Sequence, residues 1–275
     1  MTGLVRPPAV AGRFYPLEPE LLRRTVHDLL ADARPPPRTP PPPPTKAIIA
    51  PHAGYRYSGP VAASAYAAIA GARGTVTRVI VAGPAHFWPV RGVAVSSAMA
   101  FATPLGPVPV DDDARRRTLD VPGVVTDDRA HAGEHSLEVQ LPFVMAALGE
   151  VSLLPLLVGS AGAGVLAEAL DVVWGGPETC VVISTDLSHY LDASTARALD
   201  ARTAQSICRL DTPGSDAACG AAAVAGMMLA ARRHHLDVRL LDLRNSSDTA
   251  GRPERVVGYG AFALCHAGAP AGAGS

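Results

Sequence analysis

Residues 46–59 read KAIIAPHAGYRYSG, a short apolar run that ends at Pro51 and is followed at once by His52. The same order of features recurs in RVIVAGPAHF (78–87) and in CVVISTDLSHY (180–190). Each run is rich in Val, Ile and Ala, and short apolar runs of this kind are typical of buried strands. A proline or a small polar residue then breaks the run, and a histidine follows within a few positions. This layout predicts three strands that each present a histidine at the end.

Further apolar runs of strand length alternate with helical patterns along the chain. Strands are expected near 46–50, 78–82, 92–97, 151–158, 179–184, 237–243 and 256–264. Helices are expected near 18–33, 60–71, 135–148, 161–173, 195–209 and 218–233. This alternation predicts an α/β fold in which helices flank a central, mostly parallel or mixed sheet. Within 92–110, the turn TPLG predicts an antiparallel pairing.

The chain length of 275 residues, with 48% hydrophobic and 18% charged residues, fits one α/β domain, which we expect to span residues 1–267. The tract RPPPRTPPPPP predicts an extended, exposed loop at 34–45, because proline cannot join a sheet. The small residues of the tail predict disorder at 268–275.

Charge and cysteine content limit the possible partners and the compartment. The net charge is −1, so no overall attraction to nucleic acid or to an anionic membrane is expected. The chain has no apolar run of membrane-spanning length, and its first residues lack the apolar stretch of a signal peptide. The four cysteines form no CxxC pair, and reduced cysteines in a cytoplasmic protein are the expectation.

Ligands of open α/β sheets bind where the loops leave the carboxyl ends of the strands. His52, His86 and His189 each follow an expected strand, so parallel strands would bring the three side chains to one edge. Neutral imidazole is a common metal ligand and a general base near pH 7. The alternative is that each histidine caps a strand end or binds a loop carbonyl.

The stretch HAGEHSLEVQLPF (131–143) reads as the start of a helix. His135 and Glu138 are three residues apart and would share one helix face. Their order, His-x-x-Glu, is the reverse of the Glu-x-x-His pair that binds metal in some folds. The alternative is that Glu134 and Ser136 stabilise the helix N-terminus. We expect His131 to lie on the surface of a loop.

In STDLSH (184–189), Asp186 stands three residues before His189. A carboxylate near an imidazole fixes its tautomer and raises its basicity, as in general-base pairs and around metal sites. The alternative is that Asp186 or Ser188 caps the following turn. His189, Asp186 and His135 are therefore the candidate catalytic residues.

Cys219 stands where an Ala-rich helix is expected to begin. Backbone N–H groups at such a position favour the thiolate, which is both a nucleophile and a soft metal ligand. Gly220 beside it permits another group to approach closely. The alternative is that Cys219 is a small buried residue.

Eight motifs, in order, resemble those of the Memo family, whose bacterial and archaeal members are often called AmmeMemoRadiSam system protein B. They are RPPAVAGRFYP, APHAGYRYSG, GPAHF, TPLGPVPVD, EHSLEVQLPF, LLPLLVG, STDLSHY and ACGAAAV. The resemblance covers residues 5 to 265, nearly the whole chain. It implies a fold similar to that of the LigB-type class III extradiol dioxygenases, which are non-haem iron enzymes.

The resemblance also implies residue roles. The family's metal-binding positions fall on His52, His86 and Cys219, and His189 matches the acid/base position of the dioxygenases, with Asp186 nearby. Those dioxygenases have a carboxylate as third ligand, and a thiolate there shifts the preference toward softer ions. Phe87 also stands where some relatives have a second histidine.

These observations favour a metal-binding protein with iron(II) or copper and with redox or oxygenase-like chemistry on an unknown small molecule or peptide. The resemblance implies an AMMECR-type protein and a radical SAM protein as partners. Two alternatives stay open. One is a non-catalytic module that binds a peptide or protein in a vestigial cleft. The other is a metal-free enzyme with Cys219 as nucleophile.

Overall fold

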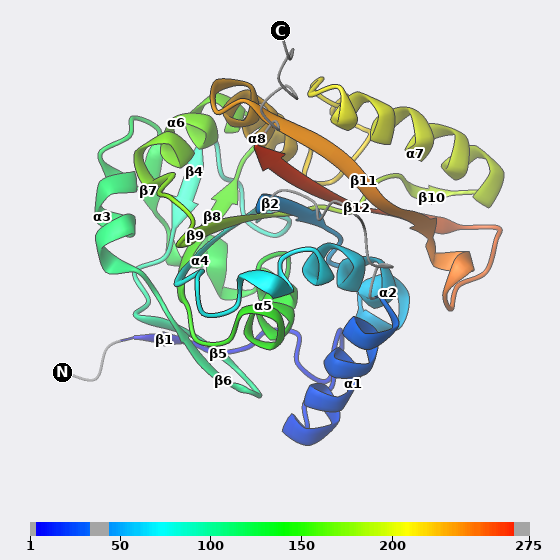
Figure 1. Cartoon of the computed structure of the whole chain (residues 1–275), viewed down its shortest axis with the longest axis horizontal. Helices are drawn as coiled ribbons and strands as arrows, with labels where there is room; N and C mark the ends of the chain where they lie inside the picture. Colours follow the sequence, from blue (N-terminus) through cyan, green and yellow to red (C-terminus); the bar gives the residue numbers. More distant parts are fainter. Residues whose placement is uncertain (1–3, 34–43, 267–275) are drawn as a thin grey trace, which may run out of the picture.

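The computed structural model describes residues 4–33 and 44–266 (Figure 1). Segment 34–43 of the expected proline-rich loop and the expected disordered tail at 268–275 lie outside the described residues. In the described part, no helix combines the length and the hydropathy that a membrane crossing requires.

A nine-stranded mixed sheet forms the centre of the fold (Figure 1). Its strands are β2 (Thr45–Ala50), β3 (Arg78–Pro84), β4 (Val93–Val95), β7 (Val124–Thr126), β8 (Ser152–Val158), β9 (Thr179–Ser184), β10 (His189–Leu191), β11 (Leu236–Asn245) and β12 (Val256–His266). The order is β10-β12-β2-β9-β3-β8-β4-β7, and β11 pairs with β12. The neighbours β2, β9, β3 and β8 run parallel, whereas β12 and β4 pair antiparallel with the outer members of this group. The α/β fold with a mixed sheet is therefore confirmed.

The apolar runs are explained by burial on both faces of the sheet. In β2, Ala47 and Ile49 face one core cluster, whereas Ile48 and Ala50 face the other. All four are fully buried. A strand that is covered on both faces has no polar face, so its sequence shows no alternation.

Eight α-helices surround the sheet among the described residues. They are α1 (Pro19–Asp32), α2 (Tyr55–Ala67), α3 (Asp112–Leu119), α4 (Asp128–Ala132), α5 (Leu141–Leu148), α6 (Ala163–Val173), α7 (Ala193–Cys208) and α8 (Ala221–Arg233). Short 3₁₀ turns occur at η1 (Ala70–Ala72), η2 (Glu138–Gln140) and η3 (Ser246–Asp248). Figure 1 shows α1, α2 and α5 on one side of the sheet and α6, α7 and α8 on the other.

Two expected helices differ at their starts. The helix expected at 60–71 begins at Tyr55, and Pro60 lies inside it. Proline lacks one N–H donor, which disfavours but does not forbid a place in a helix. The helix expected at 135–148 is instead the turn η2 followed by α5, with Pro142 in the first turn of α5. Proline is favoured there because its fixed φ suits a helix start.

The antiparallel pairing expected in 92–110 is formed by β5 (Ala100–Thr103) and β6 (Gly106–Pro109). These strands leave the main sheet and join β1 (Val5–Arg6) in a separate three-stranded sheet. Sequence patterns did not reveal β1, β7, β10, α3 or α4, because short elements carry too few residues to show a period.

Glu138 ties the N-terminal segment to the body of the fold. Its carboxylate is fully buried and pairs with the Arg6 guanidinium. It also accepts hydrogen bonds from the backbone N–H groups of Ala9 and Val10 and from the Tyr15 hydroxyl. Four donors satisfy this buried charge, so it is a structural group.

Glu138→Ala is therefore expected to destabilise the protein strongly. Removing one partner of a buried ion pair costs about 3–5 kcal/mol, because the remaining charge stays buried and unpaired. Urea unfolding followed by circular dichroism measures the loss. The control is Glu20→Ala, which removes the exposed pair with Arg23 and should cost about 0–1 kcal/mol. Equal effects of the two substitutions would contradict the structural role of Glu138.

The expectation that His131 lies on a loop surface is wrong. His131 lies in α4 and is 2% exposed, with Nε2 at 3.1 Å from the backbone oxygen of Ala94. Burial is the main reason why the pKa of His131 is lowered to about 4, so the ring is neutral at pH 7.

This shift predicts a loss of stability in mild acid. The unfolded chain takes up a proton at His131 near pH 6.5, whereas the folded chain takes it up only near pH 4. The unfolded state therefore binds more protons in this window, so the free energy of unfolding falls as the pH decreases through it, by on the order of 3 kcal/mol for this residue. Urea unfolding at pH 7 and at pH 4.5 should show a smaller loss for His131→Gln than for wild type. An equal loss would show that His131 is not the titrating group.

Candidate metal centre

Three adjacent parallel strands deliver candidate site residues to one edge of the sheet. His52 follows β2, Asp186 follows β9, and His86 follows β3. Parallel strands end at the same edge, which explains why loops far apart in the sequence meet here. Cys219 reaches this edge from the loop that precedes α8.

The structure brings His52, His86 and Cys219 together. One potential ligand atom from each residue lies within 4.8 Å of those of the other two. The Cys219 Sγ is 3.3 Å from the His52 Nε2, and the two imidazole rings lie edge to face with centroids 5.3 Å apart. His52 is buried at 2% exposure, whereas the His86 side chain is 26% exposed. The cluster is therefore anchored in the core and open to solvent on the side of His86.

Glu134 orients His86. Its Oε1 is 2.9 Å from the His86 Nδ1, and its Oε2 accepts the His86 backbone N–H at 2.6 Å. Burial raises the pKa of Glu134, but the hydrogen bonds and charge of His86 outweigh it and lower the pKa to about 2. An ionised carboxylate only accepts, so the His86 Nδ1 carries a proton and Nε2 is free to bind a metal.

The sequence interpretation placed Glu134 at a helix start. That role is wrong, because Oε1 accepts the backbone N–H groups of His135 and Ser136 but these residues precede η2 and no helix begins there. Its contact with His86 was missed. A carboxylate that binds a histidine nearly fifty positions away leaves no signal in a single sequence.

His52 is held from two sides. Its backbone N–H donates to the Asp186 Oδ1 at 2.8 Å, and its Nδ1 lies 2.9 Å from the Ser184 Oγ. Burial is the main reason why the pKa of His52 lies well below its usual value, and the neighbouring imidazoles of His135 and His86 lower it further. A neutral imidazole is the form that binds metals.

The pKa of the Cys219 thiol is not lowered, although its position before a helix suggested that it would be. Helix α8 begins at Ala221, and burial, reinforced by the charge of Asp186, raises the pKa of Cys219 to about 12. The expectation of a lowered thiol pKa is therefore wrong for the metal-free protein, because the cost of burying a thiolate exceeds the effect of the helix N-terminus. A coordinated metal ion reverses this balance and deprotonates the thiol.

Gly220 has the role expected for it. A Cβ atom there would come within 2.7 Å of the Thr185 Cβ and 2.9 Å of the Ser184 backbone oxygen. Only glycine lets the loop before α8 approach the end of β9 this closely. This approach places the neighbouring Cys219 at the cluster.

Asp186 holds the loops of the site. Its carboxylate accepts backbone N–H groups of His52 and Ala53, and its own N–H points at the Cys219 Sγ at 3.3 Å. Burial raises the pKa of Asp186 to about 7. These contacts position His52 and Cys219. The hydrogen bonds of Asp186 do not include the expected contact with His189.

His189 lies at the start of β10 and is exposed. The charge of His189 contributes to the lowered pKa of His52, and the charge of His86 contributes to the lowered pKa of His189. Partial burial of the ring lowers the pKa of His189, against a hydrogen bond with the Leu187 backbone. A neutral imidazole with access to solvent can accept a proton.

His135 completes the group of imidazoles. Its ring stacks on His86 at 4.7 Å and meets His52 edge to face at 5.4 Å. Its buried Nδ1 makes no hydrogen bond within the described part of the chain, although the Glu134 Oε1 is 3.3 Å away. His135 and Glu138 do not form the shared face expected of them, because η2 begins only at Glu138 and that carboxylate binds Arg6.

The donor set fits a transition metal. Two imidazoles have Nδ1 engaged and Nε2 available, and a sulfur lies beside them. Imidazole suits iron, copper and zinc, and thiolate adds a preference for the softer ions. The buried Nδ1 of His135, which lacks a hydrogen-bond partner within residues 4–33 and 44–266, is a further polar atom beside the cluster.

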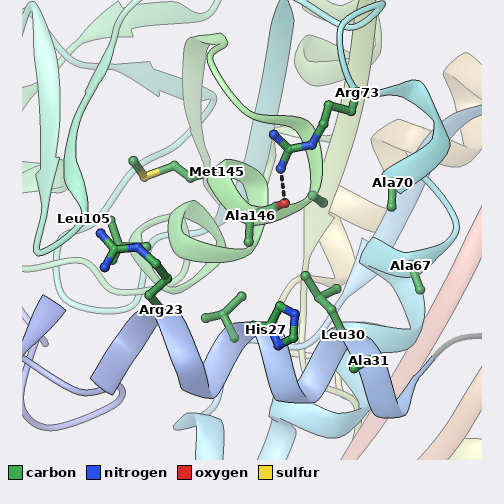
Figure 2. A pocket seen from close by; sticks show the side chains of 12 residues that line it. Arg23, His27, Leu30, Ala31, Ala67, Ala70, Arg73, Leu105, Met145 and Ala146 are labelled. Carbon is green, nitrogen blue, oxygen red and sulfur yellow. Dashed lines mark hydrogen bonds between the residues drawn. The ribbon is translucent and has the colours of Figure 1, made fainter. Parts of the chain in front are cut away.

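Figure 2 shows a different hollow, with a volume of about 610 Å³. Its lining comes from α1, the end of α2, η1 and the residue after it, the turn between β5 and β6, and the last turn of α5. It contains none of the six candidate residues. Arg23 and His27 of α1 face Arg73 and Met145 across it. Helix α2 contributes Ala67 to this lining, at the end of the helix away from Tyr55, whereas His52 precedes Tyr55 by three residues.

The family model and the curated relatives match nearly the whole chain. The model of the Memo family, described as Memo-like protein, matches residues 6–263. A MEMO1 family protein of Methanopyrus kandleri is 34% identical over 94% of this chain and 98% of its own length. One from Aquifex aeolicus is 36% identical over 93% of this chain and 97% of its own length. An uncharacterized protein of Escherichia coli K12 aligns in structure with a TM-score of 0.48 and 12% identity, over 78% of this chain and 99% of that one. By its family match and these curated relatives, the chain belongs to the Memo family.

Proposed function

We propose that this protein binds iron(II) or copper through His52, His86 and Cys219, and that the loaded site carries out redox or oxygenase-like chemistry. The observation that carries the proposal is the convergence of the three donors within 4.8 Å. The engaged Nδ1 atoms of both histidines support it, because they leave Nε2 of each ring free to bind a metal. A metal bound there would supply an electron-transfer or Lewis-acid centre.

The chain's own residues would surround that centre with defined tasks. Glu134 and Asp186 hold His86 and the His52 loop, and burial excludes water from the side of His52. His189, whose side chain is exposed, would accept or return a proton at its imidazole. This division into groups that hold the ligands and one exposed proton acceptor is typical of metal-assisted catalysis.

His189→Ala is expected to keep the metal affinity within about threefold of wild type. Removing a residue that holds a ligand weakens metal binding by about 10–100-fold, and His189 neither binds the metal nor holds a ligand, so its loss should weaken binding less. Any turnover by the loaded protein should be lost. Elemental analysis after anaerobic reconstitution measures the first effect, and oxygen uptake by the loaded protein measures the second. A variant that arrives without metal would make His189 a ligand and contradict its assigned role.

The substrate is proposed to be a small molecule or a peptide. Two aromatic side chains next to candidate residues support this, because Phe87 is 68% exposed beside His86 and Tyr190 is 62% exposed beside His189. Tyr190 also has a positive φ of 61°, a conformation that costs energy in a residue other than glycine. Exposed aromatic rings and local strain are common where a protein binds a ligand.

These rings equally favour the second candidate function, a binding module without turnover. Metal-loaded protein that binds a peptide but consumes neither oxygen nor peptide would support the module. The AMMECR-type and radical SAM partners are part of the same proposal, and co-purification from a cell that encodes all three tests them. The metal-free nucleophile is the weakest candidate, because a thiol whose pKa is raised to about 12 is a poor nucleophile at pH 7.

The experiment that tests the metal proposal is anaerobic reconstitution with iron(II) or copper(I), each followed by removal of free metal and elemental analysis. One metal ion per chain is the expected result. Retention of the same amount by the double variant His52→Ala, His86→Ala would contradict it.

A further inference from the structure

We infer that Ser184 is a positioning residue that fixes His52 in the tautomer with its proton on Nδ1, so that the bare Nε2 faces Cys219. The inference deepens the proposed metal site and rests on it. Ser184 is the last residue of β9 and is fully buried. It is not one of the three residues of the cluster, which are His52, His86 and Cys219.

Three groups surround the Ser184 hydroxyl. The backbone oxygen of Ser136 lies 2.6 Å from Oγ, the Gln140 Nε2 lies 2.8 Å away, and the His52 Nδ1 lies 2.9 Å away. A hydroxyl has one proton to donate and two lone pairs to accept with. Three partners therefore use its whole capacity, and the direction of each bond can be deduced.

The orientation of Gln140 follows from a carbonyl. The backbone oxygen of Pro51 lies 3.0 Å from one end of the Gln140 amide, and a carbonyl can only accept, so that end is the NH₂ group. The Tyr66 hydroxyl donates to the other end, Oε1, at 2.9 Å. The second N–H of the amide is then directed at the Ser184 Oγ, which accepts it.

A second carbonyl fixes the hydroxyl proton. The Ser136 backbone oxygen can only accept, so at 2.6 Å the Ser184 proton lies between the two oxygens. Both lone pairs of Oγ are then left for donors, one for Gln140 and one for His52. A bare Nδ1 on His52 would face a lone pair at 2.9 Å, and turning the hydroxyl toward it would leave the Ser136 carbonyl without a donor. Both arrangements are costly in a buried site.

The consequence reaches the metal cluster. With the proton on Nδ1, the His52 Nε2 has a lone pair directed at the Cys219 Sγ, 3.3 Å away. Glu134 fixes the tautomer of His86 with a charged carboxylate at Nδ1, whereas Ser184 fixes the tautomer of His52 with a neutral hydroxyl. The Asp186 carboxylate already lies beside His52, and a neutral hydroxyl orients the ring without adding a further charge to this buried part of the site.

Nitrogen-15 NMR of the ring nitrogens in metal-free wild-type protein tests the tautomer directly. The signal of His52 is identified by its absence in His52→Gln. Nδ1 is expected to show the shift and the one-bond proton coupling of a protonated nitrogen, and Nε2 those of a bare one. Protonation of Nε2 instead would overturn the inference.

Ser184→Ala then tests whether Ser184 is the group that fixes this tautomer. In this variant the ring is expected to populate both tautomers, and the affinity for iron(II) or copper(I) is expected to fall about 10–100-fold, as for other groups that hold a metal ligand. The control is Ser96→Ala, which removes another buried serine that binds Asp128 away from the cluster. It should change neither property. A pure Nδ1–H tautomer with wild-type affinity in Ser184→Ala would refute the role of Ser184.

The proposed metal site and the proposed role of Ser184 can be contradicted independently. The tautomer is measured without metal, so a protein that shows the expected tautomer but retains no metal contradicts the proposed function and leaves the role of Ser184 intact. Because the wild-type spectrum requires no substitution, it decides the tautomer even where Ser184→Ala does not fold.

Discussion

Replacing Cys219 with Asp is expected to reverse the metal preference of the protein. Under reducing conditions the wild-type site should retain copper(I) over iron(II), because a thiolate is a soft ligand. A carboxylate at the same place is hard and removes that preference. The ratio of copper(I) to iron(II) bound should fall by more than about tenfold, which corresponds to ~1.4 kcal/mol of relative binding free energy.

Competition between the two ions, followed by elemental analysis of both proteins, measures this reversal. The control is Cys208→Asp, which changes a half-buried cysteine at the end of α7 and should leave the ratio unchanged. Identical selectivity in wild type and Cys219→Asp would show that Cys219 does not determine the metal. The site would then have to be redrawn around His135, Asp186 and His189.

His52→Ala is expected to have the largest effect on affinity. His52 is the most buried of the three donors, and its Nε2 lies 3.3 Å from the sulfur. Loss of a direct ligand should weaken binding by at least about 100-fold, since removal of a group that merely holds a ligand costs 10–100-fold.

Equilibrium dialysis against buffered iron(II) and copper(I) measures that affinity. Circular dichroism must show a folded protein, because the deletion leaves a small space beneath the loop. The control is His266→Ala, at the exposed end of β12. Wild-type affinity in His52→Ala would remove His52 from the ligand set.

The sequence alone predicted the fold well where burial leaves a clear pattern. The runs around Ile48 and Val182 are apolar because both faces of the central strands are covered, and this feature is visible in any single sequence. Parallel order then explains why His52 and His86 lie together. The edge elements β7, β10 and α4 were missed because three to five residues show no period.

The supporting groups of the site were harder to predict. Glu134, Ser184 and Gln140 act through contacts with residues 44 to 132 positions away, and their sequence context looks like an ordinary helix start or strand end. The thiol of Cys219 was misjudged for a related reason. The helix N-terminus is visible in the sequence, whereas the burial that raises the thiol pKa depends on the packed loops.

X-ray absorption on the zinc-loaded protein tests the central claim most directly, because zinc keeps one oxidation state and has well-defined bond lengths. One metal ion held by His52, His86 and Cys219 predicts a single sulfur neighbour at about 2.3 Å and nitrogen neighbours at about 2.0–2.1 Å. The sulfur shell should be absent from Cys219→Ser. A wild-type spectrum without sulfur, or a sulfur shell that persists in Cys219→Ser, would contradict the assignment of this site.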